Sequence, residues 1–389
     1  MAAKDLSYLD HNATTPLCRE AREAMLPWLE QPIGNPSGIH APARRARAAI
    51  DEARDRIAAL LGAKSHEIIF TSGGTESCNL AILGLARRHR GTGRFHLVTA
   101  STEHHAVLHP MRSLAQHEGF ELTEIPVDAQ GLVDPSVFAA SLRPETLVAS
   151  VMIANNETGV IQPIAELSAL CREKGILFHT DAIQAFGKIP VTPRDLGVDA
   201  LSATAHKFYG PQGAGFLWLR SGVSIDSIQH GGFHENERRP GTENVAAIAG
   251  MAVAAGIAVA EVREGVESAR QTALRDRLWE GIRRSDSSAI CNSALAPRIA
   301  NTLNVSFPGC DGETLLMGLD LEGISASSGS ACMVGSIRSS HVLEAMGISA
   351  ADAGATVRFS LGRHTSEGEI DETVAALRRV LSRQFRHHG

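Results

Sequence analysis

The sequence lacks the features that mark several large classes of protein. Its six cysteines lie far apart, and no pair has the CxxC spacing typical of zinc sites, so we expect neither a bound metal nor a disulfide framework. Positive charge is in deficit, with 37 lysines and arginines against 43 acidic residues and a formal net charge of −6, which argues against nucleic-acid binding. The N-terminus, MAAKDL, has no basic segment followed by an apolar one, so no signal peptide is expected. These absences favour a reduced, cytoplasmic protein.

Long hydrophobic runs are also missing. The longest apolar stretch without a charge is residues 245–260, which are 16 residues rich in alanine and glycine. A transmembrane helix needs about 20 predominantly apolar residues. We therefore predict no membrane span and interpret this stretch as a buried helix of the core.

What the sequence does contain is an alternation of helical and strand patterns in a chain of 389 residues, long enough for two domains. Residues 42–61 place apolar side chains on one helical face, and short apolar runs typical of buried strands recur after them. This rhythm predicts an α/β fold with a mainly parallel sheet and helices on both faces. From about Gly256 a helical region at 257–284 leads into a smaller α+β domain that ends in an amphipathic helix. The strand-like segments are 67–70, 95–100, 121–127, 146–153, 176–180, 200–204, 301–307 and 357–362.

A glycine-rich segment follows the first of these strands, at the place where open α/β sheets bind ligands. Its sequence is TSGGTES (71–77). Glycines let the backbone approach an anion, and the N–H groups that begin the next helix favour a phosphate, which would involve Gly74, Thr75 and Ser77. An ordinary glycine turn with a threonine cap is the alternative interpretation.

Two charged residues stand at the ends of later strands. Asp181, with Gln184 three residues on, could hold the protonated ring nitrogen of pyridoxal phosphate, or could simply cap a helix. Lys207 precedes a Gly-Pro turn, where a fixed stem suits a covalent link between its amine and a carbonyl compound. An exposed lysine is the simpler interpretation of Lys207.

Histidines gather around the strand at 95–100, namely His96, His104, His105 and His109. No carboxylate or cysteine completes a metal-ligand set there. We therefore favour a ring that stacks on an aromatic cofactor and moves protons. Farther along, Arg358 could bind a carboxylate through two hydrogen bonds, or could belong to a structural salt bridge.

Cys332 lies in a stretch of small residues, SSGSACMVGS (327–336). Such a stretch cannot pack densely, so we expect a mobile loop with an exposed thiol. An exposed thiol is a liability unless its reactivity is used. A buried, inert cysteine is the alternative.

Many segments together resemble the cysteine desulfurases, which are class V, fold-type I enzymes dependent on pyridoxal phosphate. The matches run in order from residue 8 to about residue 375, and SSGSAC resembles the first subgroup (NifS/IscS type) rather than the RxGHHC pattern of the second. The segments are YLDHNATTP (8–16), GNPSGIH (34–40), FTSGGTES (70–77), TEHHAVL (102–108), ANNETGVIQPI (154–164), HTDAIQAFGK (179–188), AHKFYGPQGAG (205–215), GGFHENERRPGTEN (231–244) and SSGSAC with the later SHVL.

The resemblance implies a large domain, residues 15–256, built on a mainly parallel seven-stranded sheet, and a smaller α+β domain of residues 1–14 and 257–389. It implies pyridoxal phosphate as cofactor, L-cysteine as substrate, L-alanine as product, and a persulfide that an iron–sulfur scaffold protein accepts. The implied site residues are Lys207 for the covalent link, Asp181 for the ring nitrogen, Gln184 and Asn156 for the ring oxygen, His104 for stacking, Gly74, Thr75, Thr204 and His206 for the phosphate, Thr242 from the second subunit of a homodimer for the same phosphate, Arg358 and Asn156 for the substrate carboxylate, and Cys332 as sulfur acceptor.

The chain departs from the family pattern near this cysteine. Met333-Val334 stands where many relatives have Thr-Ser, and IRSS (337–340) stands where they often have LEPS, so that Arg338 replaces a negative charge. The C-terminus, RQFRHHG, lacks the apolar tail with which housekeeping members bind their scaffold. Together with NifS-like HNATT and RRPGTEN segments, these features favour a dedicated iron–sulfur system, such as nitrogenase maturation. A selenocysteine lyase or class V aminotransferase, neither of which requires Cys332, and a non-catalytic scaffold of the same fold are the alternatives.

Overall fold

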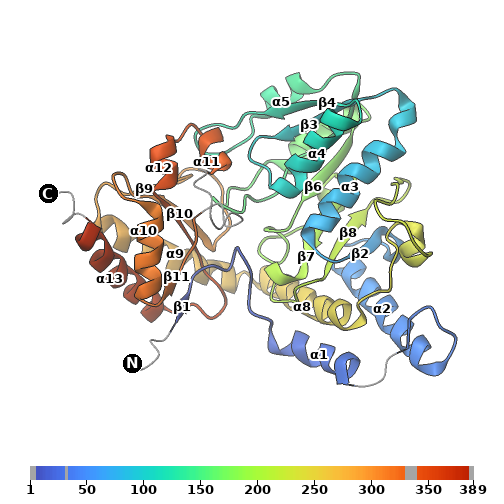
Figure 1. The fold of residues 1–389 in the computed structure, drawn as a ribbon, viewed down its shortest axis with the longest axis horizontal. Helices are drawn as coiled ribbons and strands as arrows, with labels where there is room; N and C mark the ends of the chain where they lie inside the picture. The colour runs from blue at the N-terminus through green and yellow to red at the C-terminus, as the bar shows by residue number, and fades with distance from the viewer. Residues whose placement is uncertain (1–5, 31–33, 329–339, 385–389) are drawn as a thin grey trace.

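A seven-stranded sheet forms the centre of the larger of two lobes (Figure 1). The computed structural model describes residues 6–30, 34–328 and 340–384. Four of the six strand pairs in this sheet are parallel, and β8 runs against both of its neighbours, which confirms the predicted mainly parallel fold. In spatial order the strands are β2 (Ile68–Thr71), β8 (Gly215–Leu219), β7 (Ala200–Thr204), β6 (Leu177–Asp181), β5 (Thr146–Ser150), β3 (His96–Ala100) and β4 (Glu121–Ile125). All but β8 coincide with predicted segments.

Helices cover both faces of this sheet, and alternate residues of a strand pack into opposite cores. In β8, Phe216 and Trp218 belong to one core, whereas Leu217 and Leu219 belong to the other. Helices α2, α6 and α8 contribute to the first core, and α3 and α4 contribute to the second. The helices of this lobe before α8 are α1 (Arg19–Glu30), α2 (Ala41–Leu60), α3 (Gly74–Arg88), α4 (His105–His117), α5 (Pro135–Ser141), α6 (Ile164–Glu173) and α7 (Pro193–Leu196).

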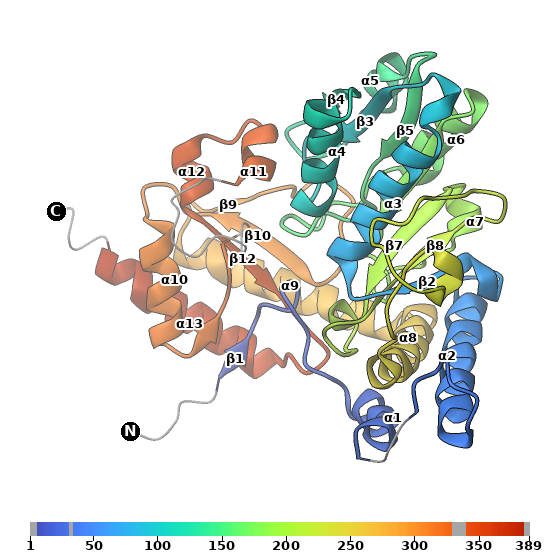
Figure 2. The same cartoon turned by 45° about the vertical axis from the view of Figure 1, so that its right-hand side comes forward.

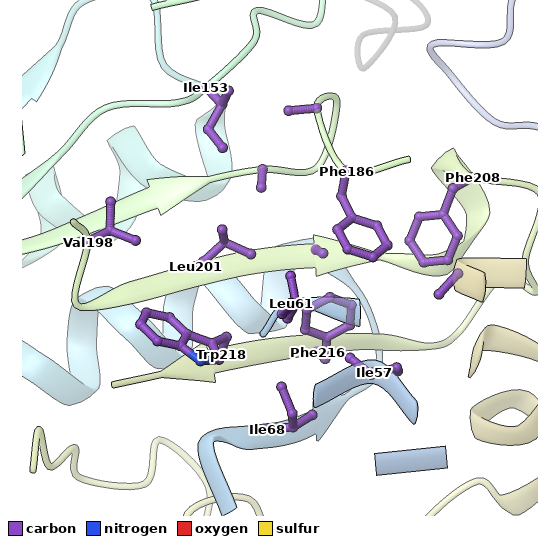
Figure 3. Close-up of a cluster of buried hydrophobic side chains, with 14 of the residues drawn as sticks. Ile57, Leu61, Ile68, Ile153, Phe186, Val198, Leu201, Phe208, Phe216 and Trp218 are labelled. Atoms are coloured by element: carbon purple, nitrogen blue, oxygen red, sulfur yellow. The ribbon is translucent and has the colours of Figure 1, made fainter. Parts of the chain in front are cut away.

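Three aromatic rings in the first core fix the ends of two strands (Figure 3). The ring centroid of Phe186 lies 5.0 Å from that of Phe208 and 5.5 Å from that of Phe216, in edge-to-face contacts. Phe186 is two residues beyond Gln184, and Phe208 directly follows Lys207. The core therefore immobilises the backbone beside two candidate site residues.

The apolar stretch at 245–260 forms most of α8 (Val245–Glu264). This helix is long and apolar enough to cross a membrane by length and composition alone, but it packs against α1 and α2 and half of its residues are buried. The prediction of a core helix is thus confirmed. Gly265, with φ 71°, ends α8, and α9 (Val266–Ser285) begins directly after it. The predicted helical region at 257–284 is therefore two helices, and the expected domain boundary near Gly256 falls inside α8.

The smaller lobe combines two small sheets with helices (Figure 1). One sheet is antiparallel, with the order β12 (Thr356–Ser360), β10 (Thr302–Ser306) and β9 (Ile290–Cys291). The other pairs β1 (Ser7–Tyr8) in parallel with β11 (Ile324–Ser325). The helices are α9, α10 (Gly312–Leu321), α11 (His341–Ala345), α12 (Ala350–Gly354) and α13 (Glu367–Gln384).

The N-terminal segment runs from the smaller lobe to the larger one (Figure 2). It starts in β1, and the backbone N–H of His11 then donates to the carbonyl oxygen of Ser360 in the smaller lobe. A few residues later, the hydroxyl of Thr15 donates to the carbonyl oxygen of His206 at 3.0 Å and accepts from the N–H of Tyr209 at 2.7 Å. Residues 11–15 therefore lie between the lobes, next to Lys207.

Candidate active site

A cavity of about 360 Å³ opens at the carboxyl ends of the parallel strands, between the two lobes. It collects side chains from segments that lie far apart in the sequence, and ten of the twelve predicted site residues line it. Thr242 does not line this cavity and is exposed, and Cys332 lies outside the described residues. The ten are Gly74, Thr75, His104, Asn156, Asp181, Gln184, Thr204, His206, Lys207 and Arg358.

Lys207 ends a short 3-10 turn, Ala205–Lys207, directly after β7. Its amine donates to the carbonyl oxygens of Asn12 at 2.5 Å and Ala13 at 2.7 Å. The next turn is strained, because Tyr209 has a positive φ of 64°. The Arg363 guanidinium lies 4.1 Å from the centroid of the Tyr209 ring, and the backbone N–H of Arg363 donates to its hydroxyl at 2.7 Å. Both lobes thus hold the turn that presents the amine, so Lys207 is not a freely exposed lysine.

Asp181 ends β6 and is buried in the floor of the cavity. One carboxylate oxygen accepts from the N–H of Ile183 at 2.8 Å, and the thiol of Cys78 lies 3.7 Å from the other. Burial raises the pKa of Asp181 to about 6, although the Ile183 N–H, the Cys78 thiol and the charge of Lys207 oppose the shift. A buried carboxylate with neutral hydrogen-bond donors would be stabilised by a cationic N–H from a ligand.

The start of α3 forms an anion-binding cup. Gly74 begins this 15-residue helix, so its first N–H groups face the cavity with the positive end of the helix dipole. A side chain at Gly74 would lie 2.3 Å from the Ile183 Cδ1 atom, so any larger residue would have to displace the Ile183 side chain. Ser77 contributes nothing to the cup, because its buried hydroxyl is hydrogen-bonded to the Thr71 hydroxyl at 2.7 Å and donates to the carbonyl oxygen of Gly73.

Two more predicted phosphate ligands border the cup. The hydroxyl of Thr204 donates to the carbonyl oxygen of Ala214 at 3.2 Å, and its oxygen keeps lone pairs for a further donor. Burial, reinforced by the charges of Lys207 and Lys188, lowers the pKa of His206 to about 4. Near neutral pH His206 is therefore neutral, and it would contribute a hydrogen bond to a phosphate rather than a charge.

His104 caps α4, and its Nδ1 accepts from the N–H of Ala106 at 3.0 Å. Burial lowers its pKa to about 4, and the neighbouring His105 and Lys207 add to the effect. A neutral ring that accepts at Nδ1 carries its proton on Nε2. His96 lies elsewhere, buried between Thr146 and Thr123. Within the described part of the chain, no group of three or more metal-type side chains converges on one point.

Residues 7–373 match the model of the protein family described as Aminotransferase class-V. The chain belongs to this family. It is 47% identical over 376 residues to "Cysteine desulfurase IscS" of Dictyoglomus turgidum, with 97% of this chain and 94% of the relative covered. It is 45% identical to "IscS-like cysteine desulfurase" of Mycobacterium tuberculosis, with 98% of each chain covered.

Solved structures agree with this assignment. A "NIFS-LIKE PROTEIN" superposes with a TM-score of 0.90 at 35% identity, covering 97% of this chain and 99% of that one. "SspA in complex with cysteine" superposes with a TM-score of 0.81 at 35% identity, covering 92% of this chain and all of that one. The resemblance to the cysteine desulfurases and the fold-type I architecture are therefore confirmed.

Two polar atoms in the wall of the cavity have no hydrogen-bond partner among the described residues. They are Nε of Arg358 and Oδ1 of Asn156, and both are buried. The guanidinium of Arg358 is held from its other side, because Nη2 donates to a carboxylate oxygen of Asp10 at 2.7 Å and Nη1 donates to the carbonyl oxygen of Asn156 at 2.9 Å. Arg358 therefore forms the structural salt bridge, and its Nε keeps a donor that a carboxylate could use. A buried donor without a partner is costly, so a bound carboxylate would fit here.

The site also contains residues that the sequence analysis missed. Asn12, Glu157 and His341 line the cavity, and the buried Glu103 supports it by accepting from the N–H of Met152 at 2.6 Å. Burial raises the pKa of Glu103 well above its usual range. All four lie in segments quoted above, and Glu103 and Glu157 directly adjoin the predicted residues His104 and Asn156. Only the fold shows that their side chains turn toward the same place.

Proposed function

We propose that this chain is a cysteine desulfurase that uses pyridoxal phosphate to remove sulfur from L-cysteine and release L-alanine. The observation that carries the proposal is a cavity uniting Lys207, Asp181 and Arg358 in a chain 47% identical to a protein named cysteine desulfurase. Lys207 supplies an amine, Asp181 a buried carboxylate and Arg358 an unsatisfied donor. The amine of Lys207 would bind the cofactor aldehyde, the carboxylate of Asp181 the ring nitrogen, and the donor of Arg358 the substrate carboxylate.

The residues present fit pyridoxal phosphate. Asp181 would hold the ring N–H, Gln184 and Asn156 the ring oxygen, and His104 the ring face. When bound, the cofactor supplies an electron sink for charge that develops at the substrate's Cα atom. The phosphate ligands would be the N-terminus of α3, at Gly74 and Thr75, together with Thr204 and His206.

Arg358 would bind the substrate, and Lys207 would transfer the proton. Arg358 would bind the cysteine carboxylate through Nε, with Asn156 beside it, while Asp10 keeps the guanidinium in place. The Lys207 amine lies at the cavity wall and would take the proton from Cα. His104 is neutral, with its free N–H available to the cavity, so it suits ring stacking and hydrogen-bond donation.

Cys332 is the proposed sulfur acceptor, and it lies outside the described residues. Its thiolate would attack the substrate sulfur, forming an S–S bond as the bond between Cβ and sulfur breaks. The bonding electrons pass to the carbon fragment, which gains a proton and becomes alanine. The enzyme keeps the sulfur as a persulfide.

We also propose a homodimer in which Thr242 completes the phosphate site of the partner subunit. Thr242 is exposed, and the side chains of Ile39 and Phe233 are 90% and 83% exposed. The segments that carry these two residues are in contact, because the Ser37 hydroxyl lies 3.4 Å from Nε2 of His234. A second copy would cover these apolar side chains. Sedimentation should show a dimer, and a fully active monomer would contradict this arrangement.

The sulfur is proposed to pass to an iron–sulfur scaffold protein in the cytoplasm. Dedication to one system, such as nitrogenase maturation, stays a hypothesis based on Arg338 and the NifS-like segments. Charge at an interface tunes partner choice more than affinity. A competition between nitrogen-fixation and housekeeping scaffolds for labelled sulfur tests it. Equal transfer to both, unchanged in Arg338→Glu, would remove the support from this residue.

Incubation with L-cysteine tests the proposed activity. We expect alanine and, with a reductant present, sulfide in equal amounts. A selenocysteine lyase would turn over selenocysteine but not cysteine, an aminotransferase would yield a keto acid, and a non-catalytic scaffold would yield nothing. Any of these three outcomes contradicts the proposed reaction.

A further inference from the structure

Lys188 is a lysine of the site region to which the proposed reaction assigns no role. It follows the turn at Gly187, whose φ is 78° and where a side chain would lie 2.9 Å from Cβ atoms of Ala258 and Phe208. The residue as a whole is half-buried, because it also lines a narrow second pocket, but its amine is surrounded by protein. In the described part of the chain, no carboxylate forms an ion pair with it. Its amine instead donates to Oε1 of Gln184 at 2.6 Å and to Oδ1 of Asn12 at 3.0 Å.

These contacts determine how the Gln184 amide is oriented. The amine donates to the oxygens of both amides, which keeps the oxygen of Gln184 pointed toward Lys188. The Nε2 group then points the other way and donates to the carbonyl oxygen of Asn12 at 2.9 Å, which can only accept. Nε2 carries a second N–H, and Gln184 lines the active-site cavity. Gln184 therefore offers a donor, not an acceptor, to a ligand.

Asn12 is oriented by the same logic. Its Oδ1 accepts from Lys188 and from Nδ2 of Asn301 at 3.0 Å, so its Nδ2 faces acceptors, the carbonyl oxygen of Asn156 and the Thr302 hydroxyl. Its backbone carbonyl oxygen accepts from the Lys207 amine. One lysine thus stabilises a hydrogen-bonded chain that ends at the proposed catalytic amine.

We propose that Lys188 is a positioning residue, which keeps the N–H of Gln184 directed at the cofactor's ring oxygen and holds the Asn12 carbonyl against Lys207. This inference rests on the proposed function. The role does not require a charge. Burial, followed by the charges of Lys207 and Arg358, lowers the pKa of Lys188 well below its usual range. A neutral amine still has two N–H groups, which is enough for both bonds.

Loss of Lys188 would leave two buried amide oxygens without this donor. A buried acceptor without a partner costs about 1–3 kcal/mol, and the Gln184 amide would keep only the bond from Nε2 to the Asn12 carbonyl oxygen, so its second N–H would no longer be held firmly toward the cavity. We therefore expect weaker cofactor binding and a changed titration of the cofactor's visible band.

The test compares Lys188→Met, Lys188→Gln and the control Lys174→Met, which removes an exposed lysine whose amine donates to the carbonyl oxygen of Leu142. Binding of pyridoxal phosphate to the apoprotein, and the pH midpoint of the visible band without substrate, are measured. Lys188→Met should weaken binding about 10- to 100-fold and move the midpoint by about one pH unit. Lys188→Gln keeps two N–H donors and should stay within about threefold of wild type. The control should match wild type.

A further variant keeps the inference testable if Lys188→Met does not fold. Gln184→Glu replaces the N–H by oxygen while leaving Lys188 in place, so it should move the midpoint, and adding Lys188→Met should move it no further. Wild-type affinity and midpoint in Lys188→Met would overturn the inference, as would a shift in Lys188→Gln as large as that in Gln184→Glu. If wild-type protein binds no pyridoxal phosphate, the proposed function itself fails.

Discussion

Replacing Asp181 by Asn should stabilise the cofactor-free protein while it damages the enzyme. Burial raises the pKa of Asp181 from 3.8 to about 6. Folding therefore disfavours the ionised form of Asp181. This lowers the free energy of unfolding by its full amount above about pH 6, and the effect vanishes as the pH falls below 3.8. A shift of about two pH units corresponds to about 3 kcal/mol at pH 8. At pH 5 the linkage relation leaves roughly half of that amount.

Asn keeps an oxygen for the Ile183 N–H and has nearly the same shape, so the variant should gain this free energy without a new clash. Urea unfolding of the apoprotein at pH 8 and pH 5 measures the gain, with Asp51→Asn on the exposed face of α2 as the control. A gain of equal size at both pH values, or none at pH 8, would refute the reasoning. In the holoenzyme the same change removes one partner of a buried charge pair, worth about 3–5 kcal/mol, so turnover should fall at least about 100-fold.

Three further predictions follow from the geometry of the site. Borohydride reduction of the yellow holoenzyme, followed by peptide mapping, should place the pyridoxyl group on Lys207, and labelling of another lysine would overturn the assignment. Arg358→Lys should raise KM for cysteine about 10- to 100-fold with a smaller change in kcat, because a point charge cannot replace the Nε donor; an unchanged KM would show that the carboxylate binds elsewhere. Gly74→Ala should weaken pyridoxal phosphate binding to the apoprotein, because its Cβ would meet the Ile183 side chain at 2.3 Å, whereas Gly91→Ala, in open space, should not; equal affinity in both variants would exclude the cup at α3.

The sequence predicted those parts of the molecule that depend on local pattern. Most strands of the large sheet are short, largely apolar runs, so six of the seven were visible, and residues at or just after their ends, such as Asp181 and Lys207, met at one edge as the topology requires. The strand β8 was missed because GFLWL is only five residues long and directly follows a glycine-rich turn, and so short an apolar run has no periodicity that distinguishes a strand. The break at Gly265 was missed because helical composition continues on both sides of it.

The missed site residues share a different cause. Asn12 and Lys188 lie in quoted segments, but nothing in the local pattern indicates what their side chains do, because each acts through a partner more than 150 residues away in sequence. Arg358 shows the same limit, since its pattern was compatible with a salt bridge and with substrate binding, and the fold gives it both an ion pair with Asp10 and an unsatisfied Nε. Such assignments depend on how the N-terminal segment passes between the lobes, which no local pattern encodes.

The proposed reaction depends on Cys332, which must hold the sulfur that is taken from cysteine. The most direct measurement is mass spectrometry of the peptide that contains Cys332 after one turnover with L-cysteine, together with the amount of alanine released. We predict one added sulfur atom on Cys332 for each alanine, and in Cys332→Ser a retained visible cofactor band, a spectral response to cysteine, and no sulfide. Alanine formed at the wild-type rate by Cys332→Ser, or wild-type turnover with no added sulfur on Cys332, would contradict the account.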